Sequence, residues 1–484
     1  MDSIAVEAAL RRMGLQVTAA EAIAVGNDLK RIAAGMQSIV RTWADASVVA
    51  SFEDVLARFG RRRSDGTQTP QPAIPFPFSP ERVSSVQRST NAFIEIFDTA
   101  AALQTPHAPA DDGNLRGLPF AYKDVFVAPG RLPTCGVGTG YRWQGPESTV
   151  LARLRTSGAI AVGATNLDPH SYMAIGLNRD FGRVINPDGP AFSVGGSSSG
   201  SAVAVAVGVV PFALGSDTGG SVRIPASLCG IYGLKPSHGL IVDPGLAPLS
   251  PSQDTAGLLA ADIACLERVF HVLAGRKACG GETIPTIGVD LGDLCEDVDP
   301  DIGACFDSAL DRAAGLGCQV LGIDFPDVAS LNLLASVVTS YEAACINAAG
   351  LFMRPEHYPA GVRRRLLTAL LVGRAPYDQA IALRPVLARH VLEAVFGRVD
   401  IVLCPTLRKR AVRVDGLSED DDNIAGAISL EHLRLTRPIN YLGLPALSVP
   451  IGRDQNGIPV GVQLIGRPNG EEELFALAKH LNRH

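Results

Sequence analysis

The sequence predicts an α/β protein with a mostly buried sheet, preceded by a short helical segment. From about residue 85 onward, short β-rich runs alternate with helical patterns, as in proteins whose helices cover a sheet. These runs are almost continuously apolar, which is typical of strands covered on both faces. The chain has 484 residues, of which 46% are hydrophobic, so it can bury a large core and exceeds the usual size of one compact domain.

Residues 1–62 are predicted to form an N-terminal helical segment. Apolar residues recur there at helical spacing, with few β-branched runs, at Val6, Leu10, Met13, Ile23, Leu29 and Ile32. Residues 63–84 are predicted to be a linker, because the proline-rich stretch from Thr69 to Pro80 cannot continue a helix. The main domain is expected to span residues 85–484. Its predicted strands are Ala159–Gly163, Gln319–Ile323, Asp400–Leu403, Ala446–Pro450 and Val460–Ile465.

Several functional classes are disfavoured by composition. The net charge is −6 and both signs are mixed along the chain, so no basic stripe indicates nucleic acid. The most apolar run, Ala202–Leu214, contains Pro211 and is too short to span a bilayer, so it is interpreted as buried structure. Asp2 and Glu7 interrupt any secretory signal, and a cytoplasmic location is expected. Nine cysteines without a CxxC pair indicate neither a disulfide framework nor a zinc knuckle, and the lack of HExxH gives no support for a metal site.

The segment with the strongest chemical signal is Ser193–Pro236, which contains the clusters GGSSSGS and SDTGGS joined by an Ala/Val spacer. Acyl transfer needs a nucleophile, a proton acceptor and preorganised donors for the oxyanion. Ser221 ends the run Thr218-Gly219-Gly220-Ser221, whose consecutive N–H groups can form an anion-binding nest beside the hydroxyl. These four residues are therefore the candidate oxyanion hole.

This segment resembles the signature sequence of the amidase signature family. The 24-residue separation of Ser197 from Ser221 is that family's spacing, and GLPFAYKDVF at 117–126 resembles the family's lysine segment. The stretches TNLDPHSYMAIG, DIVLCPT and NYLGLPALSVPIG fit as well, so the resemblance covers roughly residues 85–484 and is weak from about 280 to 370. It implies a mixed β-sheet core covered by α-helices.

The resemblance also implies a role for each matching residue. Ser221 would attack the carbonyl, and Ser197, in a cis peptide, would pass the proton to a neutral Lys123. Asp217 and Arg223 would form a supporting hydrogen-bonded pair. The resemblance further implies an acyl-enzyme hydrolase that acts on linear amides and needs no cofactor.

A lysine base is physically reasonable only if its pKa is depressed by about 3 units, which burial can achieve. The neighbours of Lys123 are apolar except for Asp124, which alternation along an extended segment would aim the other way. One departure from the family pattern is Ser199, which stands where glycine is commoner and which allophanate hydrolases share. It places a further hydroxyl near Ser197.

The same residues allow other interpretations. Gly196 to Gly200 satisfies GxSxG and would make Ser198 the nucleophile of an α/β-hydrolase elbow, but the preceding residues 190–194 are too short and broken for the required strand. The glycines do not cradle a phosphate, because no GK[ST] follows. A partner-dependent or non-catalytic subunit is a further alternative, since the family includes the amidase subunit of transamidating complexes.

The expected substrate is a small amide, with an apolar or aryl compound slightly favoured, and carbamates, ureas and allophanate stay open as alternatives. Tyr172, Met173 and Gly196 are the candidate substrate-binding residues. His170, Met353 and Tyr358 are further candidates for the acyl pocket. A small-molecule substrate is expected without nucleic acid or membrane, and a homodimer is an open option.

Overall fold

The computed structural model describes residues 2–43, 50–60, 76–98, 115–276, 284–417 and 422–481. Within these ranges eleven strands form one mixed sheet, in the order β1-β3-β2-β4-β6-β5-β10-β11-β9-β7-β8. The strands are β1 Phe93–Ile96, β2 Pro119–Lys123, β3 Ile160–Thr165, β4 Phe212–Ser216, β5 Tyr232–Lys235, β6 Ala256–Ala260, β7 Ile287–Val289, β8 Val320–Gly322, β9 Ile401–Pro405, β10 Ala446–Arg453 and β11 Pro459–Gly466. All five strands predicted from the sequence are present, shifted by no more than a few residues.

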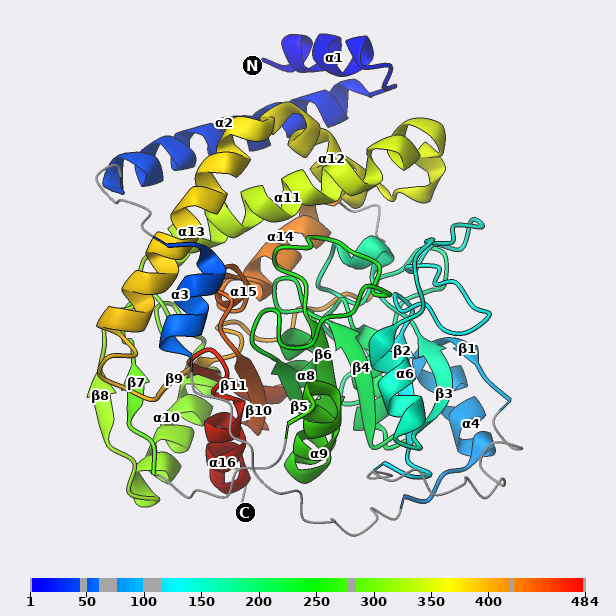
Figure 1. The fold of residues 1–484 in the computed structure, drawn as a ribbon. Helices are drawn as coiled ribbons and strands as arrows, with labels where there is room; N and C mark the ends of the chain where they lie inside the picture. The colour runs from blue at the N-terminus through cyan, green and yellow to red at the C-terminus, as the bar shows by residue number, and fades with distance from the viewer. Residues whose placement is uncertain are drawn as a thin grey trace.

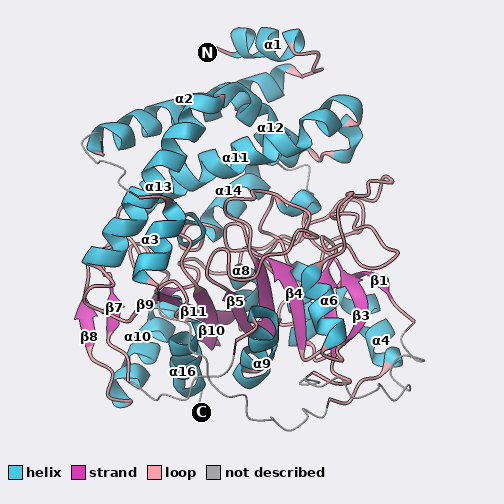
Figure 2. Cartoon of the chain, in the orientation of Figure 1, coloured by secondary structure: helices cyan, strands magenta, loops and turns pink. Residues whose placement is uncertain are grey.

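The pairing of the strands is mixed. β2 lies parallel to both β3 and β4, and β7 lies parallel to β8 and β9, whereas the remaining pairs are antiparallel. Figure 2 shows the strands as one band across the lower part of the molecule, with a layer of long helices above it. The predicted α/β class with a mixed sheet is therefore confirmed.

Helices cover both faces of the sheet. They are α1 Ser3–Arg12, α2 Ala19–Thr42, α3 Phe52–Phe59, α4 Pro80–Thr90, α6 Thr149–Thr156, α7 Ser199–Ala206, α8 Arg223–Leu228, α9 Ile263–Ala274, α10 Pro300–Gly315, α11 Val328–Met353, α12 Ala360–Val372, α13 Arg374–Ala394, α14 Asp422–His432, α15 Arg437–Tyr441 and α16 Glu471–Leu481. In β4, Phe212 and Leu214 pack into the core beneath α6 and α9, whereas Ala213 packs into the core around α7. Such two-sided burial explains why the strands are almost continuously apolar.

The apolar run Ala202–Leu214 is buried structure, as predicted. Its first part lies in α7, where the buried residues are serine, glycine, alanine and valine. Side chains of this size let α7 approach β2, β3, β4 and β6 closely. The first glycine/serine cluster therefore lies at the start of α7, and the second begins at the end of β4, the strand that follows.

The N-terminal helices pack on the main domain rather than standing apart from it. Figure 1 shows α1 and α2 at the top of the molecule, above α11 and α12. Val6, Leu10 and Val25 share a core with Tyr172 and Leu366. Met13 and Ile23 are exposed, so the predicted periodicity is wrong at these two positions. Thr18 begins α2 with a reciprocal cap, in which its hydroxyl accepts from Glu21 N and the Glu21 carboxylate accepts from Thr18 N.

The predicted linker is shorter than expected where it can be observed. Helix α4 begins at Pro80, with Ser79 as its cap, because proline suits the first turn of a helix. Residues 61–75, which hold most of the proline-rich stretch, lie outside the described residues.

One further feature concerns the longest described helix. Helix α11 is the one described helix with the length and hydropathy of a membrane span, and it packs within the protein against α2, α12, α13 and α15.

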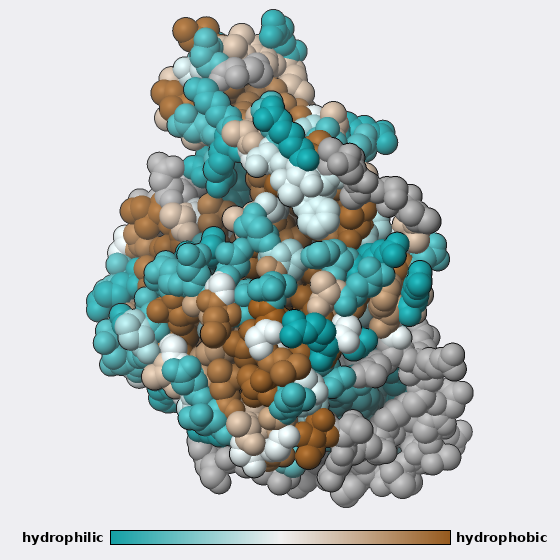
Figure 3. All heavy atoms as spheres, turned by 90° about the vertical axis from the view of Figure 1, so that its left-hand side faces the viewer, coloured by the Kyte–Doolittle hydropathy of each residue, from teal (hydrophilic) through white to brown (hydrophobic). Residues whose placement is uncertain are grey.

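Strand β8 lies at the edge of the sheet, and Figure 3 shows hydrophobic side chains gathered on the face that carries β7 and β8. Exposed apolar residues include Val320 of β8, and Ile284 and Leu291 in the segments on either side of β7.

Candidate active site

Lys123 is the last residue of strand β2, which lies between β3 and β4 in the sheet. Its side chain is fully buried. Its Nζ donates hydrogen bonds to Ser197 Oγ and to Ser216 Oγ, each at 2.7 Å. The lysine segment and both glycine/serine clusters, predicted to act together, are thus joined at a single amino group.

Burial lowers the pKa of Lys123 from 10.5 to about 7, although the carboxylates of Asp168 and Asp217 act in the opposite direction. Asp124 points away from the amino group, as the alternation along β2 predicted. Its carboxylate accepts from Arg131 Nη1 at 2.6 Å and from Thr134 N at 3.0 Å. A lysine with a pKa of about 7 has a substantial neutral fraction near pH 7, which is consistent with a proton acceptor.

The Gly196–Ser197 peptide bond is cis, and the Ser197 side chain is fully buried against Lys123. The two clusters are joined by a backbone hydrogen bond from Ser198 N to Ser221 O at 3.1 Å. Among the described residues, no hydrogen bond joins the Ser197 and Ser221 hydroxyls. Ser221 is buried and is one of the residues that line a small cavity of about 30 Å³.

The nest around Ser221 has fewer unused donors than the sequence predicted. Gly220 N donates to Asp217 Oδ1 at 2.8 Å, so this N–H already has an acceptor. In the described part of the chain, the N–H groups of Thr218, Gly219 and Ser221 donate to no protein acceptor. Gly220 adopts a φ of 132° and a Cβ there would lie 2.1 Å from Thr436 Oγ1, so only glycine fits this turn.

Asp217 and Arg223 form a fully buried ion pair beside the nest. Arg223 Nη2 donates to Asp217 Oδ1 at 2.9 Å and Nε donates to Oδ2 at 3.1 Å. Arg223 also donates to Thr436 O and to Gln463 Oε1, so its charge is well satisfied. Burial alone would raise the pKa of Asp217, but the Arg223 guanidinium and Asn440 hold it at about 2. The pair implied by the resemblance is therefore present, and it anchors the Gly220 N–H.

Three residues at the site were missed by the sequence interpretation. Ser216 accepts from Lys123, Asn440 Nδ2 donates to Asp217 Oδ1 at 2.9 Å, and Asp168 accepts from the backbone N–H of Gly176. Ser216 opens the second cluster, so its position five residues before Ser221 was a usable signal. Asn440 comes from α15, more than 200 residues further along the chain, and no local pattern indicates its contact with Asp217.

The predicted pocket residues fall in different places. Tyr172 and Met173 line the cavity beside Ser221, as expected. Gly196 packs against Asp168, since a Cβ there would overlap the Asp168 carboxylate, and it does not line that cavity. Met353 was predicted to line the pocket, but its side chain is 72% exposed at the end of α11, so this prediction is wrong.

The predicted His170 and Tyr358 belong to a neighbouring aromatic wall. Their rings stack at 4.7 Å, and His170 Nε2 lies 3.0 Å from the carbonyl oxygen of His357. His170 lines a second small cavity with Cys135 and Ser171. Burial lowers the pKa of His170 to about 4, so the ring is neutral at pH 7.

The structure contradicts the elbow alternative at Ser198. No strand precedes the motif within residues 184–198, all of which are described, whereas the elbow requires a strand-to-helix turn. Ser198 Oγ is fully buried and lies 3.3 Å from both Ser216 O and Ser216 N. The neighbouring Ser199 Oγ is buried and has no hydrogen-bond partner among the described residues.

One group of potential metal ligands occurs among the described residues, away from the site. It comprises Glu267, His271 and Glu472, whose ligand atoms lie within 4.8 Å of one another. Glu267 pairs with Lys479 at 2.7 Å and His271 Nε2 lies 2.8 Å from Glu472. These contacts explain the cluster as an ion-pair network that joins α9 to α16.

Comparison with known proteins agrees with this geometry. Residues 78–475 match the family described as Amidase. The chain belongs to the Amidase family. The predicted family and its amidase signature fold are therefore confirmed.

Relatives of this Amidase chain have several functions. It is 33% identical over 449 residues to a glutamyl-tRNA(Gln) amidotransferase subunit from Synechococcus sp. (strain CC9605), a match that covers 82% of this chain and 90% of the relative. A crystal structure of an amidase superimposes with a TM-score of 0.74 at 30% identity, covering 83% of this chain and 94% of that one. 6-Aminohexanoate cyclic dimer hydrolase in complex with substrate has a TM-score of 0.71 at 25% identity, covering 83% and 91%.

Proposed function

We propose that the chain hydrolyses a carbon–nitrogen bond of a small amide through an acyl-enzyme formed on Ser221. The observation that carries the proposal is the fully buried Lys123, whose amino group lies 2.7 Å from Ser197 Oγ and has a pKa lowered to about 7 by burial. A neutral amine in this position can accept a proton, whereas a surface lysine would stay charged.

The roles follow from the positions of the groups. Ser221 Oγ attacks the carbonyl carbon while its proton passes through Ser197 to Lys123. The N–H groups of Thr218, Gly219 and Ser221 stabilise the oxyanion, with Gly220 held by Asp217. As the tetrahedral intermediate collapses, the leaving amine takes the proton back from Lys123 through Ser197. Water then attacks the acyl-enzyme along the same proton path and releases the acid.

The cavity beside Ser221 also has an apolar side, formed by Met173, Leu249 and Leu433. This supports a small acyl group with some hydrophobic surface, in keeping with the apolar or aryl amides expected from the sequence. Carbamates, ureas and allophanate present the same electrophilic carbonyl, so these classes belong in the same test.

The experiment is a substrate panel of anilides, primary amides, carbamates and ureas, assayed with the wild type and with Ser221→Ala. The proposal expects turnover of at least one amide, with burst release of the aniline where deacylation is slow. It also expects Ser221→Ala to lose this activity. Turnover of ureas or carbamates without any amide would assign the alternative substrate class. Activity retained in Ser221→Ala would contradict the proposed nucleophile.

A second candidate is a subunit that works only with a partner. It is favoured by the 33% identity to a protein named as a subunit of an amidotransferase. The same panel discriminates the two functions, because a chain that needs a partner has no activity when purified alone. All three proposed catalytic side chains are present, which favours the independent enzyme.

A further inference from the structure

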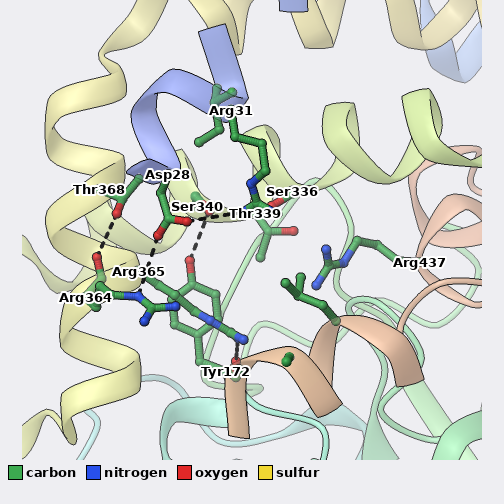
Figure 4. A pocket seen from close by; sticks show the side chains of 14 residues that line it. Asp28, Arg31, Tyr172, Ser336, Thr339, Ser340, Arg364, Arg365, Thr368 and Arg437 are labelled. Atoms are coloured by element: carbon green, nitrogen blue, oxygen red, sulfur yellow. Dashed lines mark hydrogen bonds and ion pairs between the residues drawn. The ribbon is translucent and has the colours of Figure 1, made fainter. Parts of the chain in front are cut away.

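A larger cavity, of about 200 Å³, lies next to the one that holds Ser221. Figure 4 shows that its walls come from several elements, with Arg31 of α2 above, Arg364 and Thr368 of α12 on the left and Arg437 of α15 on the right. Its charged lining consists of four arginines and one aspartate: Arg31, Arg364, Arg365, Arg437 and Asp28. Among the described lining residues, positive charges therefore outnumber negative ones, although the whole chain carries a net charge of −6.

The two cavities are adjoining parts of one site. Tyr172, Thr339, Arg365 and Arg437 line both of them. A ligand whose carbonyl lies at Ser221 would therefore extend past these four side chains into the larger cavity. What lines that cavity bears directly on the choice of substrate.

Arg437 lies closest to the catalytic nest. It begins α15 and packs against Gly219, where an added Cβ would lie 3.5 Å from Arg437 Nε. Its guanidinium makes no hydrogen bond or ion pair with any described residue. Burial, with the nearby charge of Arg365, lowers the pKa of Arg437 to about 9. A guanidinium in such surroundings is stabilised strongly by an anionic ligand.

The one acidic side chain among the described lining residues already pairs with two of the arginines. Asp28 pairs with Arg31 at 3.4 Å and with Arg364 at 3.6 Å. Arg365 donates to the Tyr172 carbonyl oxygen and lies over the Tyr172 ring, 5.4 Å from its centroid. Arg365 is thereby fixed in place, and Figure 4 shows its guanidinium and that of Arg437 approaching from opposite sides.

We propose that the substrate carries a carboxylate at the end remote from the scissile bond, and that Arg437 and Arg365 bind it between them. This inference rests on the proposed function and narrows its substrate class to amides of acidic compounds. A planar guanidinium matches a carboxylate with two parallel hydrogen bonds, which an ammonium group cannot do. The apolar residues Met173 and Leu249 would contact the methylene groups between the two ends.

The proposal also assigns a role to the N-terminal helical segment. Asp28, Arg31 and Ile32 of α2 form the outer wall of the cavity. The ion pair of Glu21 with Arg363, at 2.8 Å, holds α2 against α12. This segment thereby completes the substrate pocket.

The test measures binding, so that it does not depend on turnover. Ser221→Ala protein is titrated calorimetrically with monoamides of dicarboxylic acids that have two to four methylene groups, and with neutral analogues in which isopropyl replaces the carboxylate. The same ligands are titrated into Ser221→Ala/Arg437→Met, into Ser221→Ala/Arg437→Lys and into a control, Ser221→Ala/Arg389→Met. Arg389 forms an exposed pair with Glu393 on α13 and lies outside both cavities.

At least one acidic monoamide is expected to bind about tenfold or more tightly than its neutral analogue, and this preference is lost with Arg437→Met. Arg437→Lys retains part of it, and the control retains all of it. Equal binding of acidic and neutral ligands, absence of binding by the whole series, or the same loss for both ligands in Arg437→Met would overturn the proposal. Selective binding by a wild type that hydrolyses no amide would uphold the carboxylate site and refute the proposed hydrolysis.

Discussion

The glycine/serine centre of the molecule and the wall of the larger cavity are built in opposite ways. The centre, residues 193–236, is one continuous stretch that contains both serines, the nest and the Asp217–Arg223 pair. The cavity wall is assembled from α2, α11, α12, α14 and α15, which are far apart in the sequence. In the proposed function, all of the catalytic groups except Lys123 of β2 therefore come from one segment, whereas the proposed substrate contacts come from several helices.

This difference has a physical origin. The centre depends on backbone N–H groups, a cis peptide and glycines, whose positions are fixed over short distances along the chain. The wall depends on long arginine side chains, which reach a common cavity from separate helices. Changes in the centre should therefore affect every substrate, whereas changes in the wall should affect only some.

The largest expected effect is the loss of activity in Ser221→Ala. Removing the nucleophile should lower kcat by about 10⁴-fold or more on all substrates, as in other serine hydrolases. Steady-state kinetics on two unrelated amides measures it. If one amide is still cleaved at the wild-type rate, the centre does not act on all substrates in the same way.

The next largest effect concerns stability. Arg223→Met leaves Asp217 buried without its cation, and should lower the free energy of unfolding by about 3–5 kcal/mol. Arg389→Met removes an exposed helical pair and should lower it by no more than about 1 kcal/mol. Denaturant unfolding compares the two variants. Equal losses would show that the Asp217–Arg223 pair does not hold the nest together.

The pH dependence should follow Lys123. Because the neutral amine is the base, kcat/KM should rise about tenfold per pH unit up to about pH 7 and then level off. The folded pKa of about 7 lies below the unfolded value of 10.5, so the unfolded chain binds the extra proton between these values. The contribution of Lys123 to stability should therefore increase with pH across this window, by about 5 kcal/mol, and should decrease as pH falls toward 7. Lys235, whose pKa burial also lowers to about 7, adds a change of the same sign.

Lys123→Met provides the matched control for that window. It cannot titrate, so its stability should change less between pH 7 and 10 than that of the wild type. A wild-type kcat/KM that does not change with pH below pH 7 would contradict a lysine base.

The smallest effect is expected for Ser199→Ala. The Ser199 hydroxyl is buried without a partner, so its removal should leave the free energy of unfolding within about 0.5 kcal/mol or raise it slightly. Activity should stay within a few-fold of the wild type. A large loss of activity would indicate that this hydroxyl takes part in the proton path.

The sequence was informative where structure is local. The five strands, the buried Ala202–Leu214 run and the inward and outward directions of Lys123 and Asp124 follow from periodicity and apolar character. The contact of Lys123 with Ser197 could be predicted because the motifs that contain them are long and specific. The hydrogen bond from Gly220 N to Asp217 Oδ1 could not be predicted, because it depends on the backbone conformation of the turn that contains both residues.

The substrate pocket was far less predictable. Met353 was expected to line it, but α11 turns this residue to the surface. Arg437 and Arg365 were not singled out, because each is an ordinary arginine in its own segment and only the packing of α12 and α15 brings them together. Periodicity likewise placed Met13 inward, although the end of α1 leaves it exposed.

The central claim is that Ser221 is the nucleophile activated by a neutral Lys123. The most direct measurement is trapping with a fluorophosphonate at several pH values, followed by mass spectrometry of the labelled peptide. The account predicts a single adduct on Ser221, formed at a rate that rises with pH up to about 7 and that falls strongly in Lys123→Met. An adduct on Ser198 or Ser199, or labelling of Ser221 at a rate independent of Lys123, would contradict it.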